Sequence, residues 1–131
     1  MLTNAGVRPT IPVINLERAK NFYGSKLGLK PVTNNSNIVA APNTALFDCG
    51  NGTSIELYQR NATKADHTVA TFEVKNIENE VKNLKSNGVL FEEYDLPGLK
   101  TKDGIAEQGP IKCAWFKDTE GNILCIHQTT R

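Results

Sequence analysis

The 131-residue sequence lacks several features that mark particular classes of protein. No apolar run approaches the ~20 residues that a membrane-spanning helix needs. The first residues, Met1 to Asn4, lack the basic and apolar regions of a secretory signal. The 15 Lys and Arg against 14 Asp and Glu leave a net charge of +1, without the basic surface of a nucleic-acid or membrane-surface binder. We therefore expect a cytoplasmic protein with no nucleic-acid or membrane partner.

Cysteine is also scarce, with only Cys49, Cys113 and Cys125. None forms a CxxC pair, which excludes a zinc knuckle and a thioredoxin-type motif. An odd number of cysteines without a secretion signal is typical of reduced thiols in a cytosol. The remaining composition, 39% hydrophobic and 22% charged, is that of a folded globular chain, and the length suits one domain.

An internal repeat is the most informative feature of the chain. The segment VINLE at 13–17 recurs as VKNIE at 74–78, a spacing of 61 residues. Each copy follows a strand-like run, at 10–14 and 68–74, and contains an asparagine suited to capping a helix, Asn15 or Asn76. Apolar residues at helical spacing come next, and each helical pattern ends at a glycine, Gly28 or Gly88, which favours a left-handed turn.

Short strand candidates follow each predicted helix. They are 38–41, 45–47 and 54–59 in the first half, and 89–93, 112–117 and 123–128 in the second. The final strands match at a spacing of 69, pairing Gln59 with Gln128, so the second half carries about eight extra residues. These fall within 95–109, for which we expect a long surface loop that closes over a binding site.

Each half therefore shows the pattern β-α-β-β-β, and one such half is too small to bury its own core. We predict an α+β fold in a single domain, residues 1–131, made of two βαβββ modules, 5–60 and 66–129, related by a pseudo-twofold axis. Helices would cover one face of the sheets, and the other face would enclose a core, a partner or a cavity.

Two segments carry a family resemblance. They are 11–29, with IPVINLERAKNFY followed by LGL, and 115–124, WFKDTEGNIL, in which Thr119 stands where proline is usual. Together with the repeat, they resemble the vicinal oxygen chelate superfamily, which includes glyoxalase I, bleomycin-resistance proteins, fosfomycin-resistance enzymes and extradiol dioxygenases. The resemblance implies the glyoxalase/bleomycin resistance fold, a cup-shaped mixed sheet around a pocket, often in a homodimer.

The resemblance also implies four metal-ligand positions, which are Arg8, Glu56, Val69 and Cys125 here. Only Glu56 is a usual ligand, since Arg8 has no lone pair to offer and Val69 has no donor atom. One thiolate and one carboxylate are an incomplete set, so we expect no metal cofactor. Glu56 then either pairs with Arg8 or serves a ligand directly, and it is the best candidate for a general base.

A displaced metal site is the alternative. His67 lies two residues before Val69, and His127 lies two residues after Cys125. With Glu56 they would make an adequate set for zinc or iron(II). A two-residue step covers ~6.6–6.8 Å of strand, however, whereas metal bonds measure ~2.0–2.2 Å. Ordinary strand-end histidines are therefore the favoured interpretation.

Further pocket residues follow from strand alternation, namely Thr10, Pro12, Ser54, Tyr58, Thr71, Ile123 and His127. Trp115 alternates with Phe116, the expected core residue, so its ring should face the pocket. There it would either stack on a planar ligand or fill an interface.

Three functions remain open at this point. The leading hypothesis is a metal-independent small-molecule-binding or resistance-type protein, acting as a homodimer, whose ligand residues are Arg8, Glu56, Tyr58, Trp115, Cys125 and His127. The second is a divalent-metal-dependent lyase or dioxygenase that uses Glu56, His67 and His127. The third is a partner-binding module whose cup is filled by its own side chains, with no cavity of ~300 Å³ or more.

Overall fold

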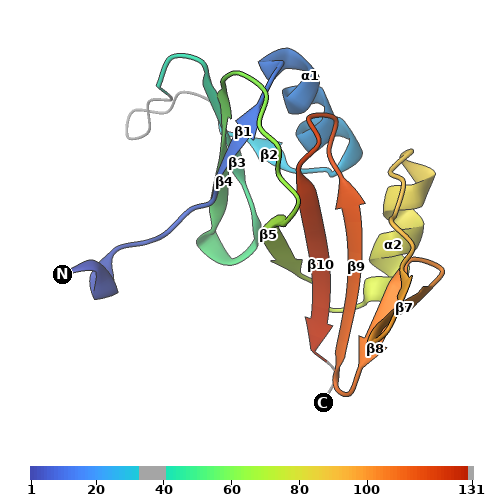
Figure 1. Ribbon diagram of the computed structural model, residues 1–131. Coiled ribbons are helices and arrows are strands. Elements are labelled where there is room, and N and C mark those ends of the chain that lie inside the picture. Colours follow the sequence, from blue (N-terminus) through green and yellow to red (C-terminus); the bar gives the residue numbers. More distant parts are fainter. Residues whose placement is uncertain (33–40, 130–131) are drawn as a thin grey trace. The chain divides into compact units, whose positions relative to one another are not determined.

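The computed structural model describes residues 1–32 and 41–129 (Figure 1). The chain divides into two compact units, Met1–Thr63 and Lys64–Arg131, which we call the first and second modules. Each module has a mainly antiparallel sheet and one main helix after its first strand, so the predicted α+β fold class is confirmed. No described helix has both the length and the apolar character needed to cross a membrane.

The first module contains one four-stranded sheet and one main helix. Its elements are η1 (Leu2–Asn4), β1 (Thr10–Val13), α1 (Leu16–Asn21), η2 (Phe22–Lys26), β2 (Lys30–Pro31), β3 (Thr44–Asp48), η3 (Gly50–Gly52) and β4 (Ser54–Gln59). The strand order is β1-β4-β3-β2, with β1 parallel to β4 and the other pairs antiparallel. The predicted strand at 38–41 falls mostly outside the described residues.

Alternation along β1 and β4 divides the first sheet into two faces. Ile11, Val13, Ile55 and Leu57 are buried on the side where α1 packs against β3 and β4. The helix contributes Ala19, and the π turn η2 continues its apolar stripe with the buried rings of Phe22 and Tyr23. Residues of the other parity, including Glu56, lie on what we call the open face, the side that carries no helix of this module.

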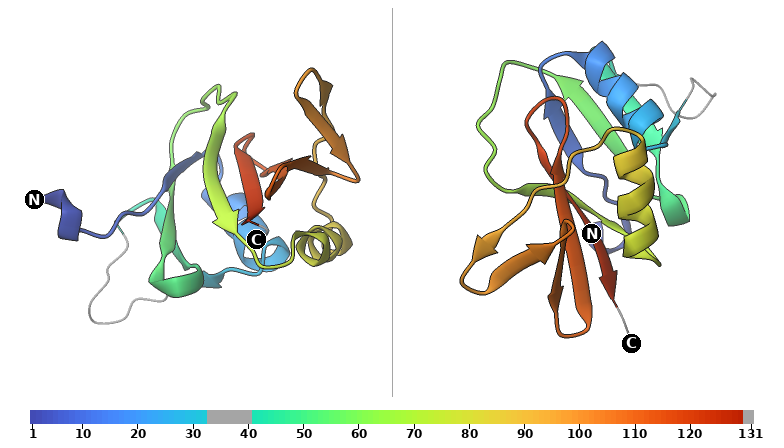
Figure 2. Two further views of the ribbon diagram at one scale, coloured as in Figure 1. Left: turned by 90° about the horizontal axis from the view of Figure 1, so that it is seen from below. Right: turned by 90° about the vertical axis from the view of Figure 1, so that its right-hand side faces the viewer.

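The second module repeats this plan with additional strands. Its elements are β5 (Thr68–Glu73), α2 (Ile77–Ser86), β6 (Asp95–Leu96), β7 (Leu99–Lys102), β8 (Ile105–Gln108), β9 (Ile111–Lys117) and β10 (Ile123–Thr129). The strand order is β5-β10-β9-β8-β7-β6. The part β5-β10-β9-β8 has the order of the first sheet, and α2 packs on β9 and β10 (Figures 1 and 2).

The residues chosen as helix boundaries have the expected roles. The side chain of Asn15 accepts a hydrogen bond from the Arg18 N–H, and that of Asn76 accepts one from the Asn79 N–H, so each caps an otherwise unsatisfied donor. Gly28 and Gly88 have φ values of 75° and 90°, the left-handed conformation that ends a helix. The buried stripe of α2 is Ile77, Val81 and Leu84.

The prediction of a surface loop over 95–109 is wrong. This segment forms β6, β7 and β8, which extend the sheet beyond β9. Asp103 and Gly104 join β7 to β8 with φ values of 54° and 84°, the pattern of a two-residue hairpin turn. The predicted strand at 89–93 is also wrong, because only an isolated bridge between Phe91 and Phe116 forms there.

One glutamine in each module joins the last strand to the start of the helix. The side-chain oxygen of Gln59 accepts the N–H of Leu16 at 2.9 Å, and that of Gln128 accepts the N–H of Ile77 at 2.7 Å. Both bonds satisfy first-turn donors that have no partner within the helix. The two glutamines are the pair that the 69-residue spacing aligned, so the duplication extends to individual hydrogen bonds.

The turn between β9 and β10 is held by a buried carboxylate. Oδ1 of Asp118 accepts the N–H groups of Glu120 and Asn122, each at 2.8 Å, and Oδ2 accepts the side-chain amide of Asn122 at 2.8 Å. Gly121 completes the turn with a φ of 86°. The DTEGN segment therefore has a structural role.

We predict that Asp118→Ala lowers the free energy of unfolding by about 2–4 kcal/mol, because three charge-assisted hydrogen bonds are lost and Asn122 stays buried. Urea denaturation would measure the change. Asp48→Ala is the control, since Asp48 is exposed at the end of β3, and we expect an effect of about 0.5 kcal/mol or less there. Equal effects in the two variants would contradict this role of the turn.

Candidate functional site

The open face of the first sheet carries the polar residues expected from strand alternation. In the register of β1 and β4, Thr10 lies beside Glu56 and Pro12 lies beside Tyr58. Ser54 has the same parity on β4 as Glu56 and Tyr58. These residues face away from the buried Ile55 and Leu57.

Arg8 reaches Glu56 from the segment that precedes β1. Its Nη2 donates to Oε2 of Glu56 at 3.4 Å, and the two side chains are 45% and 20% exposed. Such partly exposed ion pairs contribute about 0–1 kcal/mol. The pair compensates the charge of Glu56, but it does not remove the carboxylate from solvent, so Glu56 remains available to a ligand.

The open face of the second sheet brings together Thr71, Cys113, Trp115, Cys125 and His127. In the register, Cys125 lies beside both Thr71 and Trp115, and His127 lies beside Cys113. Cross-strand neighbours share a face, while Leu124, Ile126 and Phe116 are buried on the side of α2. The inference that Trp115 points away from the core of Phe116 therefore agrees with the register.

A cavity of about 200 Å³ lies on this open face. Its lining is mostly apolar and comes from β7, β8 and β9: Leu99, Ala106, Gln108, Ile111, Cys113 and Trp115. Tyr94 packs edge-on against Trp115, with ring centroids 5.6 Å apart and an interplanar angle of 83°. This contact fixes the indole at one side of the cavity, and such a fixed aromatic surface suits a planar ligand.

Two thiols, of Cys113 and Cys125, lie on the β9 and β10 part of this face. Burial, together with the neighbouring thiol of Cys113, raises the pKa of Cys125 to about 12. Burial also raises the pKa of the Cys113 thiol, and the charge of Glu73 adds to this. Both groups are therefore protonated at neutral pH and behave as small apolar side chains with weak hydrogen-bonding capacity.

The two histidines have different surroundings. His127 is mostly buried, and its Nδ1 lies 2.5 Å from Oε1 of Glu73. His67 is 71% exposed, and its nearest acidic partner is Asp66 at 3.8 Å. His127 thus lies beside a carboxylate on the neighbouring strand, although its Nδ1 makes no hydrogen bond of good geometry within the described part of the chain, whereas His67 is a surface residue beside the start of β5.

The side chains at the four implied metal positions do not fit a divalent ion. The guanidinium of Arg8 is bonded to Glu56 and Val69 has no donor atom, so Glu56 and Cys125 are left as an incomplete ligand set. Within the described part of each module, no three His, Cys, Asp or Glu side chains lie close enough together to hold a metal ion.

The predicted ligand residues divide between the modules. Arg8, Glu56 and Tyr58 lie in the first module, and Trp115, Cys125 and His127 lie in the second. Sequence reasoning missed Cys113, although it is two residues before Trp115 and so shares its face. It also missed the cavity residues Leu99, Ala106 and Gln108, because the segment that contains them was taken to be a loop.

Comparison with known proteins gives one family match and many structural matches. The family model described as the Glyoxalase/Bleomycin resistance protein/Dioxygenase superfamily matches residues 7–126. No curated protein matches the sequence.

The solved structures similar to this chain include three that differ in their described function. A glyoxalase/dioxygenase from Nostoc punctiforme has a TM-score of 0.70 at 16% identity, covering 99% of this chain and 94% of that one. TnmS3, an antibiotic binding protein from Streptomyces sp. CB03234, has a TM-score of 0.67 at 16% identity, and the match covers 98% of this chain and 99% of that one. FosX, a fosfomycin resistance protein from Listeria monocytogenes complexed with Mn(II) and sulfate, has a TM-score of 0.67 at 15% identity, and the match covers 97% of this chain and 91% of that one. At these identities the likeness establishes the fold alone.

We predict that Cys125 resists alkylation in the folded protein. With a pKa of about 12, about one thiol in ten thousand is ionised at pH 8, and only the thiolate reacts. Iodoacetamide labelling at pH 8, followed by peptide mass spectrometry, should find Cys125 unmodified until urea unfolds the chain. Labelling of Cys125 in the native protein at the rate of the unfolded chain would contradict the environment described above.

Proposed function

Because the chain belongs to the glyoxalase/bleomycin resistance protein/dioxygenase superfamily, we propose that it binds a small organic molecule on the open sheet face of its second module and acts without a metal. The observation that carries this proposal is the cavity beside Trp115. Its volume of about 200 Å³ is below the ~300 Å³ of ordinary ligand pockets, so it suits a ligand of at most a few rings and not a larger molecule. The family supplies both enzymes and binding proteins on one scaffold, so the residues of the site must decide between them.

The lining of the cavity supports binding. Leu99, Ala106 and Ile111 offer apolar surface, Trp115 offers an aromatic face, and Gln108 offers one amide. This mixture of a mainly apolar lining with a few polar groups is typical of small-molecule sites. The amide of Gln108 donates to the Gly98 carbonyl at 2.8 Å, which leaves its own carbonyl oxygen as an acceptor for a ligand.

The polar groups nearby favour holding a molecule over transforming it. The thiols of Cys113 and Cys125 have raised pKa values, so neither is an activated nucleophile at neutral pH. In the first module, Glu56 is paired with Arg8. A binding or resistance-type role, in which the protein sequesters its ligand, needs none of these groups to be reactive. TnmS3 is a structural relative that binds an antibiotic.

A metal-dependent lyase or dioxygenase is the second candidate, and FosX with its Mn(II) gives the reason to keep it. In this chain it would use Glu56, His67 and His127. His127 favours it in one respect, because ligating histidines usually have a carboxylate on their other ring nitrogen, and Glu73 occupies that position.

We predict that a planar aromatic probe, 1,8-naphthalimide, quenches the fluorescence of Trp115, the only tryptophan of the chain. Ile111→Phe places a larger ring at the edge of the cavity, and we expect it to weaken binding about tenfold, a loss of about 1.4 kcal/mol. Fluorescence titration measures the dissociation constant of the probe for the unchanged protein and for the variant.

Leu90→Phe is the matched control, because Leu90 is an exposed aliphatic residue outside the cavity. It should bind the probe like the unchanged protein. An equal loss of affinity in both variants, or no quenching at all, would contradict a ligand site beside Trp115.

Elemental analysis of protein purified without a polyhistidine tag separates the two candidate functions. We expect less than about 0.1 equivalent of zinc, iron or manganese per chain, because two of the four implied ligand positions hold a paired arginine and a valine, which have no electron pair to donate. One equivalent, lost on substituting His127→Ala, would instead support the metal-dependent enzyme.

A further inference from the structure

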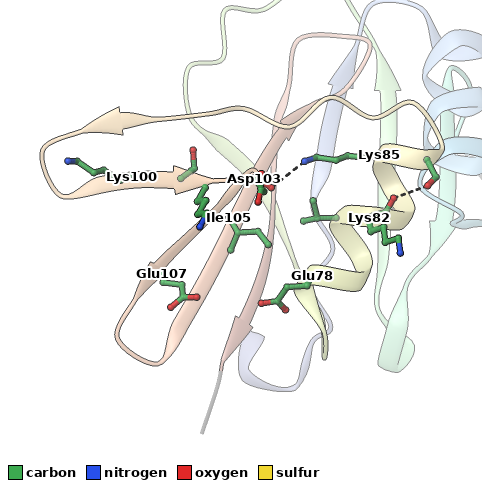
Figure 3. A pocket seen from close by; sticks show the side chains of 11 residues that line it. Glu78, Lys82, Lys85, Lys100, Asp103, Ile105 and Glu107 are labelled. Carbon is green, nitrogen blue, oxygen red and sulfur yellow. Dashed lines mark hydrogen bonds between the residues drawn. The ribbon is translucent and has the colours of Figure 1, made fainter.

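A second concave surface lies on the opposite face of the second sheet. It is a groove between α2 and the β7–β8 hairpin, with a volume of about 970 Å³ (Figure 3). Its lining residues come from both walls: Glu78, Val81, Lys82, Lys85 and Ser86 from the helix, and 100–103, Ile105 and Glu107 from the hairpin. We call it the helix–hairpin groove.

The strands beyond β9 explain why this groove exists. The helix α2 packs on β9 and β10, while β8 and β7 continue the sheet beyond β9, so the hairpin extends past the part of the sheet that the helix covers. Ile105 lines the groove, and its neighbour Ala106 lines the cavity of Trp115. Because adjacent strand residues point to opposite faces, the groove is a separate site from that cavity.

The floor of the groove is aliphatic. Val81 is 4% exposed in the stripe of α2, and Ile105 is half-buried opposite it on β8. Together they offer an apolar surface on which the body of an organic molecule can pack. The volume also lies within the range of small-molecule pockets, about 300–1,000 Å³.

The charges of the groove are distributed unevenly. Glu78 and Glu107 both bind Lys112, at 2.6 Å and 3.6 Å, and the bond from Lys112 lowers the pKa of Glu78. These two carboxylates therefore have a cation already. In Figure 3 they lie toward one end of the groove, and the labelled Lys85 and Asp103 lie toward the other.

The lysines of the groove have weaker partners. Within residues 1–32 and 41–129, Lys85 donates only to the backbone carbonyl of Asp103, at 3.3 Å, and Lys100 lies 3.9 Å from Asp95. Among the described residues, no acidic group lies within 4 Å of Lys82 or Lys102. The groove thus combines an apolar floor with positive charge that the side chain of Asp103 compensates only in part.

We propose that the helix–hairpin groove binds a small amphipathic organic anion. Its apolar body packs on Val81 and Ile105, and its carboxylate or sulfonate group lies between Lys85 and Lys102. An inorganic anion would leave the apolar floor unused, and a nucleic acid would need far more positive charge than the net +1 of this chain. The proposal is independent of the function assigned to the cavity of Trp115.

Two fluorescent probes with the same aromatic body test the role of charge. They are 1-anilinonaphthalene-8-sulfonate, an anion, and N-phenyl-1-naphthylamine, which is neutral. The double variant Lys85→Met with Lys102→Met should weaken binding of the sulfonate about fivefold, as expected for two exposed charge contacts. Binding of the neutral probe should change by less than about twofold, since methionine keeps an apolar side chain in place.

The control is the double variant Lys64→Met with Lys75→Met, which makes the same change of charge at two exposed lysines of the same module outside the groove. It should bind both probes like the unchanged protein, and circular dichroism should show that both double variants are folded. An equal loss of sulfonate binding in the control would overturn the proposal, because net charge alone would then explain the effect.

Ile111→Phe separates this proposal from the proposed function. If the sulfonate occupies the groove, this variant of the other cavity leaves its affinity unchanged. If Ile111→Phe removes sulfonate binding while the groove variant retains it, the probe occupies the cavity of Trp115 and the groove is not its site. Absence of sulfonate binding in the unchanged protein would also overturn the proposal, whatever the result with 1,8-naphthalimide.

Discussion

The hydrogen bond between a last-strand glutamine and the first N–H of a helix is the constraint on which each module depends. Gln59 and Gln128 make this bond with Leu16 and Ile77, so each glutamine must point to the helix side of its sheet. Because a strand alternates its side chains, the residue before each glutamine must point to the open side. Tyr58 and His127, and Glu56 and Cys125 two residues before them, therefore share the open side of their sheets, in agreement with the burial of Leu57 and Ile126 between them.

Much of this architecture could be predicted because the signals are local. Asn15 and Asn76 cap helices by a contact three residues away, and the alternation of buried residues depends only on strand geometry. The segment 95–109 was misjudged for a physical reason as well. Asp103-Gly104 is a strong hairpin signal, but the strands that it joins, LKTK in β7 and IAEQ in β8, have few apolar residues. Pairing of β8 with β9, and of β7 with β8, supplies the stability that their own sequence lacks.

The candidate site shows the same division between local and non-local information. The identity of Glu56, Cys125 and His127 as open-face residues follows from counting along one strand. The cavity beside Trp115 does not, because its walls come from three strands whose mutual register is a property of the folded sheet. Partners such as Glu73 for His127 and Tyr94 for Trp115 likewise lie on other segments, and no spacing in the sequence indicates them.

The short outer strand of the first module has a consequence for the behaviour of the protein in concentrated solution. An exposed sheet edge is a template for pairing with other chains, and such pairing leads to aggregation. Among the described strands of the first module, β1 and β2 lie at the two edges of the sheet, and β2 consists of Lys30 and Pro31. Proline has no N–H to donate and lysine adds charge repulsion, so these two residues offer an incoming strand little to pair with.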